Sequence, residues 1–244
     1  MGNETVEAAR IAADAAAEAE HSQEMIHYLA WNTPLGEIHM QTMMMTWIAM
    51  AIVFLLFFAA SRNPKMIPSG LQNVLEYFID FLDGLMESNL GVKGRKYMAP
   101  FIITLFMFIL VSNEIGMLPQ AGIHWTSPTN DVNTCFALSI TVAVSVYIVG
   151  VIHHGMSHFK HFISPNPVFL PLHLLDAITK PLTMALRLFG NILAGEILLI
   201  VLYELVPWVI PELWVMFSLF IGFIQAFIFT VLALTSYATV FGEH

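Results

Sequence analysis

Charged residues are scarce in this chain, and their scarcity excludes a soluble globular domain. Of 244 residues, 11% are charged and 57% are hydrophobic, and the mean hydropathy is +0.73. A soluble domain carries about 25% charged residues, because water must hydrate its surface. The sequence therefore predicts an all-α polytopic membrane protein.

Basic residues are fewer than acidic ones: the chain has nine Lys and Arg and 18 Asp and Glu, so the net charge is −9. This balance gives no indication of nucleic-acid binding. The first 40 residues hold seven acidic residues and one arginine, so they lack the basic start of a signal peptide. A single cysteine, Cys135, excludes an intramolecular disulfide framework and is expected to be a small inert helix residue.

No phosphate-binding loop, catalytic triad or paired-cysteine motif occurs in the sequence. We therefore expect no nucleotide, cofactor or metal to bind to this chain. Four histidines, at 153, 154, 158 and 161, lie close together and could suggest a metal site. A solvated turn beside Lys160 is the simpler interpretation.

Long apolar runs are what the chain does contain. The segments 43–60, 97–117 and 135–152 each approach the roughly 20 residues that a bilayer requires. Two longer apolar segments, 167–206 and 212–241, follow and are separated by Pro207 and Pro211. About five membrane-embedded helices are predicted, in a single domain over residues 41–244 that follows an acidic extension and surface segment, 1–40.

Residues 68–90 differ from these spans because their polarity alternates with helical spacing. Apolar side chains recur on one side and acidic or amide side chains fill the other. The apolar positions are Leu71, Val74, Leu75, Phe78, Leu82 and Leu85. This pattern predicts an amphipathic helix lying along the membrane surface. Residues 21–40 are also expected at the surface.

The basic residues predict the orientation. Most of them fall in 62–96 or at Lys160, and these two regions share a side if the first three spans each cross once. The positive-inside rule makes that side cytoplasmic. The N-terminus and the 118–134 loop are then outside and the C-terminus is cytoplasmic.

One arginine interrupts the long apolar segment, in "ALRLFGN", and it cannot lose its proton to enter lipid. At 100° per residue, Thr183 and Asn191 lie about 40° from Arg187, and Lys180 and Asp176 lie about 20° from it. These five residues form one polar stripe. The stripe either packs against neighbouring helices or lines a hydrophilic path centred on Arg187, and we favour the path.

A glutamate lies on the opposite side of the same segment. Glu196 is about 180° round the helix from Arg187 and about 13.5 Å further outward, whereas Asp176 lies about 16.5 Å toward the cytoplasm. A buried carboxyl at Glu196 suits an ion-accepting group in an aqueous cavity, although a hydrogen bond to another helix would also explain it. The arrangement resembles two half-routes that meet at Arg187 without running through it.

Weaker candidates lie near the predicted outer ends of the spans. Asn113 and Glu114 end the second span, Asp131 precedes the third, and Ser218 and Gln225 share a face of the last helix. Residues at the membrane interface would equally explain Glu114 and Asp131.

The stretch "KPLTMALRLFGNILAGEILL" (180–199) resembles subunit a of F-type ATP synthases. The segments "FIQAFIFTVLALTSY" (223–237), "MLP" after Asn113 and "SPTNDVN" (127–133) resemble the same family in the same order. The resemblance extends over most of the chain from about residue 40. It implies that the last two segments form a long, tilted hairpin beside a rotor ring.

The family's functional residues can be carried over where its motifs match. The resemblance assigns the stator arginine to Arg187, the asparagine one turn later to Asn191, the outer-channel carboxylate to Glu196, and the glutamine to Gln225. Ser218 stands where some members have a histidine that pairs with this glutamate.

On the cytoplasmic side, His173 stands where some members have a carboxylate, and Asp176 takes that role one turn later. Lys180 and Thr183 complete the cytoplasmic half-channel, while Asn113, Asp131 and Ser218 join Glu196 in the outer one.

The implied function is that of a stator subunit that conducts ions but is not catalytic alone. Its implied partners are the rotor ring of subunit c, the peripheral stalk subunit b and the lipid bilayer, in a bacterial plasma membrane. The sequence does not distinguish H⁺ from Na⁺. A proton-coupled secondary transporter is the main alternative, but no inverted repeat supports it. Five aligned polar residues disfavour a purely structural anchor.

Overall fold

The computed structural model describes residues 30–33, 36–62, 70–117, 126–155, 170–206 and 209–241. The chain divides into two compact units, Met1–Met44 and Met45–His244. The predicted tail over residues 1–20, the basic turn around Lys160 and the last three residues lie outside the described residues.

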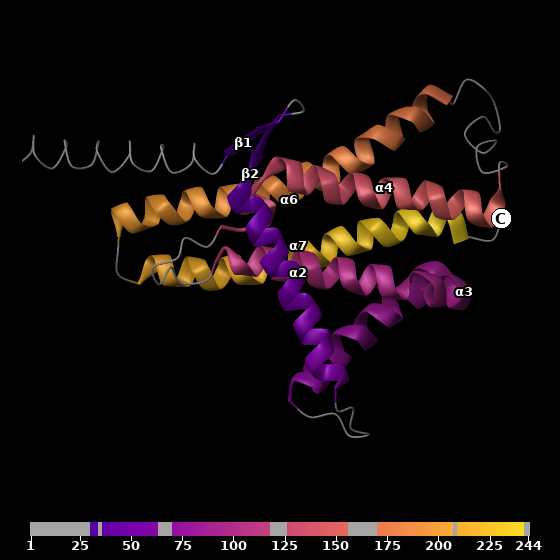
Figure 1. Ribbon diagram of the computed structural model, residues 1–244, viewed down its shortest axis with the longest axis horizontal. Helices are drawn as coiled ribbons and strands as arrows, with labels where there is room; N and C mark the ends of the chain where they lie inside the picture. Colours follow the sequence, from indigo (N-terminus) through magenta and orange to yellow (C-terminus); the bar gives the residue numbers. More distant parts are fainter. Residues whose placement is uncertain are drawn as a thin grey trace, which may run out of the picture. The chain divides into compact units, whose positions relative to one another are not determined.

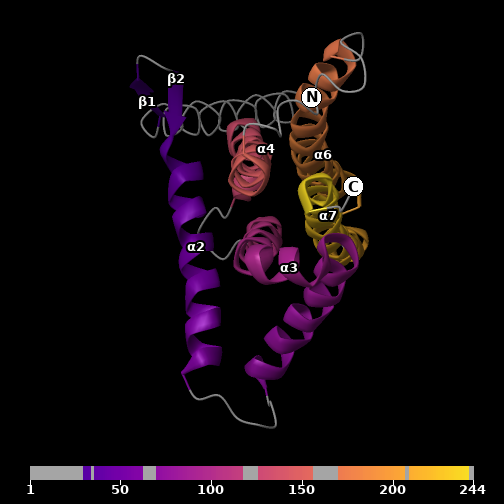
Figure 2. The same ribbon diagram turned by 90° about the vertical axis from the view of Figure 1, so that its right-hand side faces the viewer.

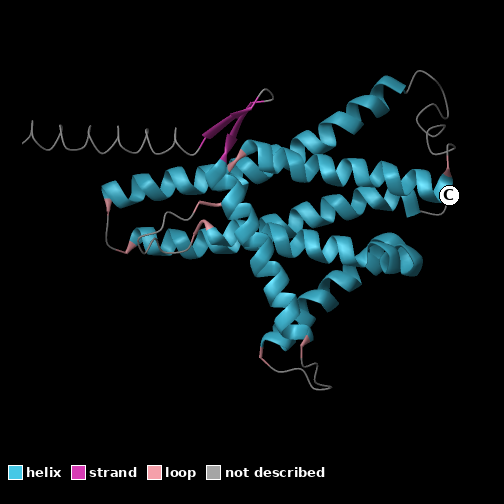
Figure 3. Cartoon of the chain, in the orientation of Figure 1, coloured by secondary structure: helices cyan, strands magenta, loops and turns pink. Residues whose placement is uncertain are grey.

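The first unit contains the only strands among the described residues. Strands β1 (Ala30–Thr33) and β2 (Gly36–His39) pair antiparallel, with Trp31 opposite Ile38 (Figure 3). The sequence pattern of this stretch predicted a segment at the membrane surface and no strands. Each strand has only four residues, which is too short for a pattern of alternating polarity to stand out.

Five helices are long and apolar enough to cross a membrane, which confirms the all-α membrane fold. They are α2 (Met40–Ser61), α3 (Leu71–Ile115), α4 (Val132–His154), α6 (Leu170–Leu205) and α7 (Ile210–Phe241). A short 3₁₀ helix, η1 (Pro128–Asn130), lies within the predicted 118–134 loop. Helix α4 begins at Val132, three residues earlier than predicted, because the Asp131 side chain caps it.

Helix α3 is bent at Gly91, so the predicted surface helix and the second span are its two arms (Figure 2). Gly91 has φ 67° and ψ 177°, and it is the one non-helical residue inside α3. The predicted surface helix ended at residue 90 and the predicted span began at 97, but the second arm is helical from residue 92. A single glycine suffices to make the turn.

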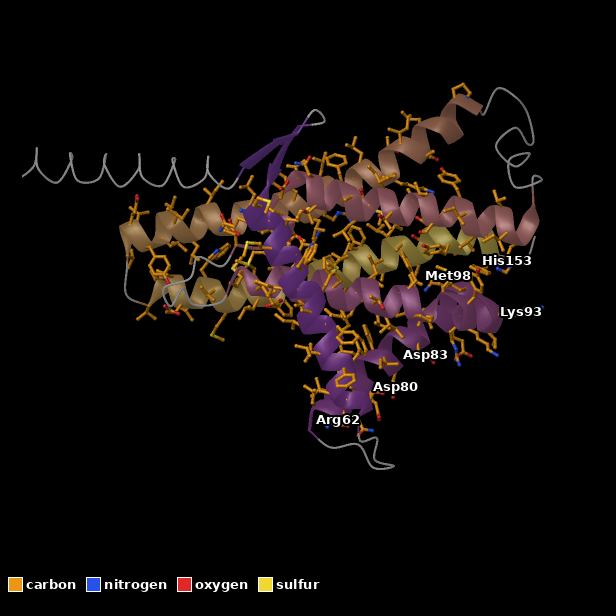
Figure 4. The ribbon with its side chains drawn as sticks, in the orientation of Figure 1. Arg62, Asp80, Asp83, Lys93, Met98 and His153 are labelled. Carbon is orange, nitrogen blue, oxygen red and sulfur yellow. The ribbon has the colours of Figure 1, made fainter. Side chains whose placement is uncertain are left out.

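A basic residue joins the two arms across the bend. Arg95 Nη1 lies 2.7 Å from Glu87 Oε2 and 3.2 Å from Asp83 Oδ2. Figure 4 shows Lys93 at the bend and Asp80 and Asp83 along the first arm. The pairs are partly exposed, so their main effect is to hold the angle between the arms.

Part of the predicted apolar stripe of the first arm is buried in the protein. Leu75 and Leu82 are buried, whereas Leu71 and Val74 are exposed. The buried stripe continues instead through Met86 and Leu90 toward the bend. The start of the arm therefore leaves the protein core, and its apolar side chains are free to meet lipid.

Replacing Gly91 with alanine is expected to lower the free energy of unfolding by about 1–3 kcal/mol, the strain of a side chain in this backbone region. Gly84→Ala is the matched control, because Gly84 lies inside the first arm with nothing within 4 Å of an added Cβ. Thermal unfolding of the purified complex measures both. Equal midpoints for the two variants would contradict a bend fixed by Gly91.

The second arm of α3 packs against α7, and α4 packs against α6 (Figure 1). Large buried side chains, among them Phe106, Ile109 and Phe229, form this core. A hydrogen bond of 2.5 Å between Ser145 Oγ and Tyr237 Oη joins α4 to α7. The packing leaves α6 the more open helix: 17% of its most apolar window is buried, compared with 50% for α3.

Helices α6 and α7 form the predicted hairpin. Trp214 Nε1, in the first turns of α7, donates a 3.1 Å hydrogen bond to the carbonyl of Gly195 in α6. At the other end of α7, Phe241 contacts His153 of α4, with ring centroids 4.9 Å apart. The bend of α3 lies at this same end, because His153 also stacks edge-on against Tyr97 at 5.4 Å.

Candidate ion pathway

Part of the predicted polar stripe lines a hollow between α6 and α7. Helix α6 continues through Pro181, so the stripe keeps its helical spacing. Lys180, Thr183 and Arg187 face Thr235 and Ser236 of α7 around a hollow of about 200 Å³. We call it the Arg187 hollow. Its walls carry two cations and, with Thr179, four hydroxyl groups, so it is able to hold water and ions.

Arg187 itself is exposed on the surface of the chain. Among the described residues it has no carboxylate partner, since both ion pairs found there belong to Arg95. A cation on a membrane helix requires water or an opposite charge. The Arg187 guanidinium is thus open to water or to an opposite charge outside the described residues.

The remaining stripe residues lie outside this hollow. Asp176 is exposed near the start of α6 and does not line it. The backbone of His173 is part of α6, but its side chain is outside the described residues. Asn191 lines a second hollow of about 190 Å³ with Gly195, Ser218 and Trp214, which we call the Ser218 hollow. The two hollows share no residue.

Glu196 has a partner that the sequence pattern did not predict. Asn130 of η1 donates from Nδ2 to Glu196 Oε2 over 2.5 Å, and Glu196 is half-buried. Asn130 lies within the "SPTNDVN" motif, but only the folded chain shows that η1 reaches α6. Ser218, at the position of the family histidine, makes no hydrogen bond to Glu196 among the described residues.

Asn113 connects three elements at the same end of the helices. Its Nδ2 donates to the Gly222 carbonyl of α7 over 3.1 Å, and its Oδ1 accepts from Thr129 Oγ1 of η1 over 2.8 Å. The side chain is fully buried. Ser127 adds a 2.7 Å hydrogen bond to the Ser112 carbonyl. Asn113 is therefore occupied in positioning its neighbours.

Asp131 also has a structural partner. Its Oδ1 accepts a 2.8 Å hydrogen bond from the backbone N–H of Asn133, which caps the start of α4. Gln225 is buried in α7. It lies two helical turns after Ser218 on the same face.

Several buried polar atoms at this end lack partners. Among the described residues, four buried side-chain oxygens accept or donate no hydrogen bond: Ser112 Oγ, Glu114 Oε1, Asn130 Oδ1 and Ser218 Oγ. They come from α3, η1 and α7, and η1 contacts Glu196 through Asn130. An unpaired buried polar atom costs about 1–3 kcal/mol, so each of these four oxygens calls for a polar partner outside the described side chains.

Comparison with known families gives one match. The family model described as ATP synthase A chain matches residues 43–238. The matched region contains all of α3, α4 and α6 and every candidate site residue. It leaves out the hairpin of β1 and β2.

Proposed function

Because the chain belongs to the ATP synthase A chain family, we propose that its two hollows are the inner parts of two ion half-channels that Arg187 separates. The protein is the ion-translocating stator subunit of a rotary ATP synthase. It is not catalytic alone, and it works in the membrane sector with the ring of c subunits.

The observation that carries this proposal is the exposure of Arg187 without a carboxylate partner among the described residues. Large apolar neighbours on α6, including Leu182 and Leu186, are exposed with it. An apolar surface of this kind with one cation fits a rotor helix that carries one carboxylate. Arg187 then stabilises the ionised form of that carboxylate and repels cations that would leak between the half-channels.

The cytoplasmic half-channel is assigned to the Arg187 hollow and the start of α6. Lys180 and Thr183 line the hollow, and Asp176 lies further along the same face. His173 is one turn before Asp176. These groups would receive the ion that a rotor carboxyl releases.

The outer half-channel is assigned to the Ser218 hollow and to Glu196. Asn191 and Ser218 line the hollow, and Glu196 faces η1. Asn113 and Asp131 hold the surrounding backbone, and Gln225 extends the polar face of α7 toward the middle of the helix.

Rotation follows from the separation of the two paths. An ion arriving through the outer half-channel neutralises a rotor carboxylate, which can then turn into lipid. After nearly a full turn it meets the cytoplasmic half-channel, where the ion leaves. Each charge that crosses gains about 2.3 kcal/mol per 100 mV, so several crossings must combine for each ATP.

The packed helices have two ends. One end holds the bend of α3, His153 and Phe241, and the other holds Asn113, η1 and Glu196. We assign the first end to the cytoplasm because it carries Lys93, Arg95 and Lys96. The N-terminus is then outside, in a bacterial plasma membrane. We also assign the peripheral stalk subunit b as a partner.

Disulfide cross-linking tests the proposed contact with the ring. In a Cys135→Ser background, Leu186→Cys should cross-link to a cysteine placed beside the rotor carboxylate. Leu188→Cys is the matched control, because Leu188 is on the same helix but fully buried, whereas Leu186 is 49% exposed. Cross-linking through 188 and not 186 would reverse the assigned face. A chain that purifies without any ring would favour the secondary transporter instead.

A further inference from the structure

One half-buried carboxyl at the outer end has no part in the mechanism above. Glu114 lies in the last turn of α3, directly after Asn113. Its Oε1 is buried and has no hydrogen-bond partner among the described residues. The same oxygen lies against α7, 2.8 Å from the position that a Cβ on Gly222 would occupy.

Among the described residues, no cation forms an ion pair with this carboxyl. Residues 97–159 contain no Lys or Arg, and none follows Arg187. The other carboxyls of the elements at this end are Glu196 and Glu204 on α6, Asp131 before α4, and Glu212 on α7. A half-buried carboxylate without a cationic partner in a membrane protein must bind a proton or another cation.

An unpaired hydroxyl lies on the same face of α7. Ser218 is one turn before Gly222, it is 8% exposed, and its Oγ has no partner among the described residues. Ser218 Oγ also lies 3.9 Å from the Cβ position of Gly195, the residue next to Glu196. The side chains of Glu114 and Ser218 thus connect α3, through α7, to the backbone that carries Glu196.

We propose that Glu114 is a second ion-binding carboxyl of the outer half-channel, with Ser218 Oγ as its neighbour and Gly222 providing the space. The proposal rests on the outer half-channel assigned above. The transported monovalent cation, H⁺ or Na⁺, binds Oε1 of Glu114 and passes along Ser218 toward Glu196. The carboxylate is regenerated when the ion moves on.

The space at Gly222 is specific to this contact. An added Cβ would lie 2.8 Å from Glu114 Oε1 and 3.4 Å from Asn113 Cβ. The first distance requires Glu114 to move, whereas the second requires a shift of a few tenths of an ångström. Gly222→Ala should therefore act mainly through Glu114.

Ion flux through the intact membrane sector tests the proposal. Glu114→Gln should lower both potential-driven flux in liposomes and ATP synthesis by about tenfold, with the ring still co-purifying. Glu114→Asp should restore part of the flux. The loss should appear for whichever ion the wild type conducts, measured as H⁺ flux without Na⁺ and as Na⁺ flux with it. Glu204→Gln, an exposed carboxyl on α6, should leave the flux unchanged.

If the ion flux is at the wild-type level in Glu114→Gln but is slowed in Glu196→Gln, this inference is overturned and the proposed function still stands. Wild-type flux in both variants would also overturn the assignment of the outer half-channel. If Glu114→Gln prevents assembly, Gly222→Ala decides. It should slow the flux when Glu114 is present and add nothing in a Glu114→Ala background. An equal loss in both backgrounds would make Gly222 a packing residue and refute the proposal.

Discussion

Replacing Arg187 with alanine is expected to abolish coupled ATP synthesis while the complex still assembles. Without the cation, a rotor carboxyl in the gap would keep its ion, or ions would cross between the half-channels without rotation. Passive flux through the membrane sector should therefore rise as synthesis falls to background. Synthesis by inverted vesicles and flux after removal of the soluble part measure the two effects.

Two further variants test whether the effect is specific to the guanidinium at position 187. Arg187→Lys should rescue poorly, because a desolvated ammonium can lose its proton and lacks the planar guanidinium. Arg62→Ala removes an exposed arginine after α2 and should behave as the wild type. Tight coupling at wild-type rates in Arg187→Ala would mean that the arginine is structural.

Glu196→Gln is expected to have the second-largest effect, a fall of about tenfold or more in ion uptake from outside. Glutamine keeps the size of the side chain and an oxygen that can accept the hydrogen bond from Asn130, but it cannot bind and release an ion. The initial rate of potential-driven ion uptake into cells or right-side-out vesicles is the measurement.

The matched control is Glu212→Gln, which removes an exposed carboxyl in the first turn of α7. Asp176→Asn should instead slow exchange with the cytoplasm and leave uptake from outside intact. If Glu196→Gln slowed only the cytoplasmic step, the assignment of the outer half-channel to Glu196 would be wrong.

The sequence predicted the features that depend on local pattern. The length of the apolar runs gave the five helices, and the helical spacing around Arg187 placed Lys180 and Thr183 beside it. Helical spacing alone could not show that Asp176 and Asn191 lie outside the Arg187 hollow, which Lys180 and Thr183 line. That separation depends on where α7 lies against α6.

Features that depend on contacts between distant segments were missed. Asn130 pairs with Glu196 across 66 positions, and Asn113 with Gly222 across 109. No local pattern encodes which amide reaches which helix. Leu71 and Val74 fit an apolar stripe but are exposed, because periodicity identifies the apolar face and not where the core ends.

Accessibility of single cysteines is the most direct test of two half-channels separated by Arg187. In a Cys135→Ser background, Ser218→Cys and Thr183→Cys would be exposed to silver ions, which are small enough for a narrow aqueous path. Serine at 135 keeps a donor to the Thr129 carbonyl. Inhibition of ring rotation should occur from outside only for the cysteine at 218, and from the cytoplasm only for the cysteine at 183. Equal access to both cysteines from one side would contradict the separation of the half-channels by Arg187.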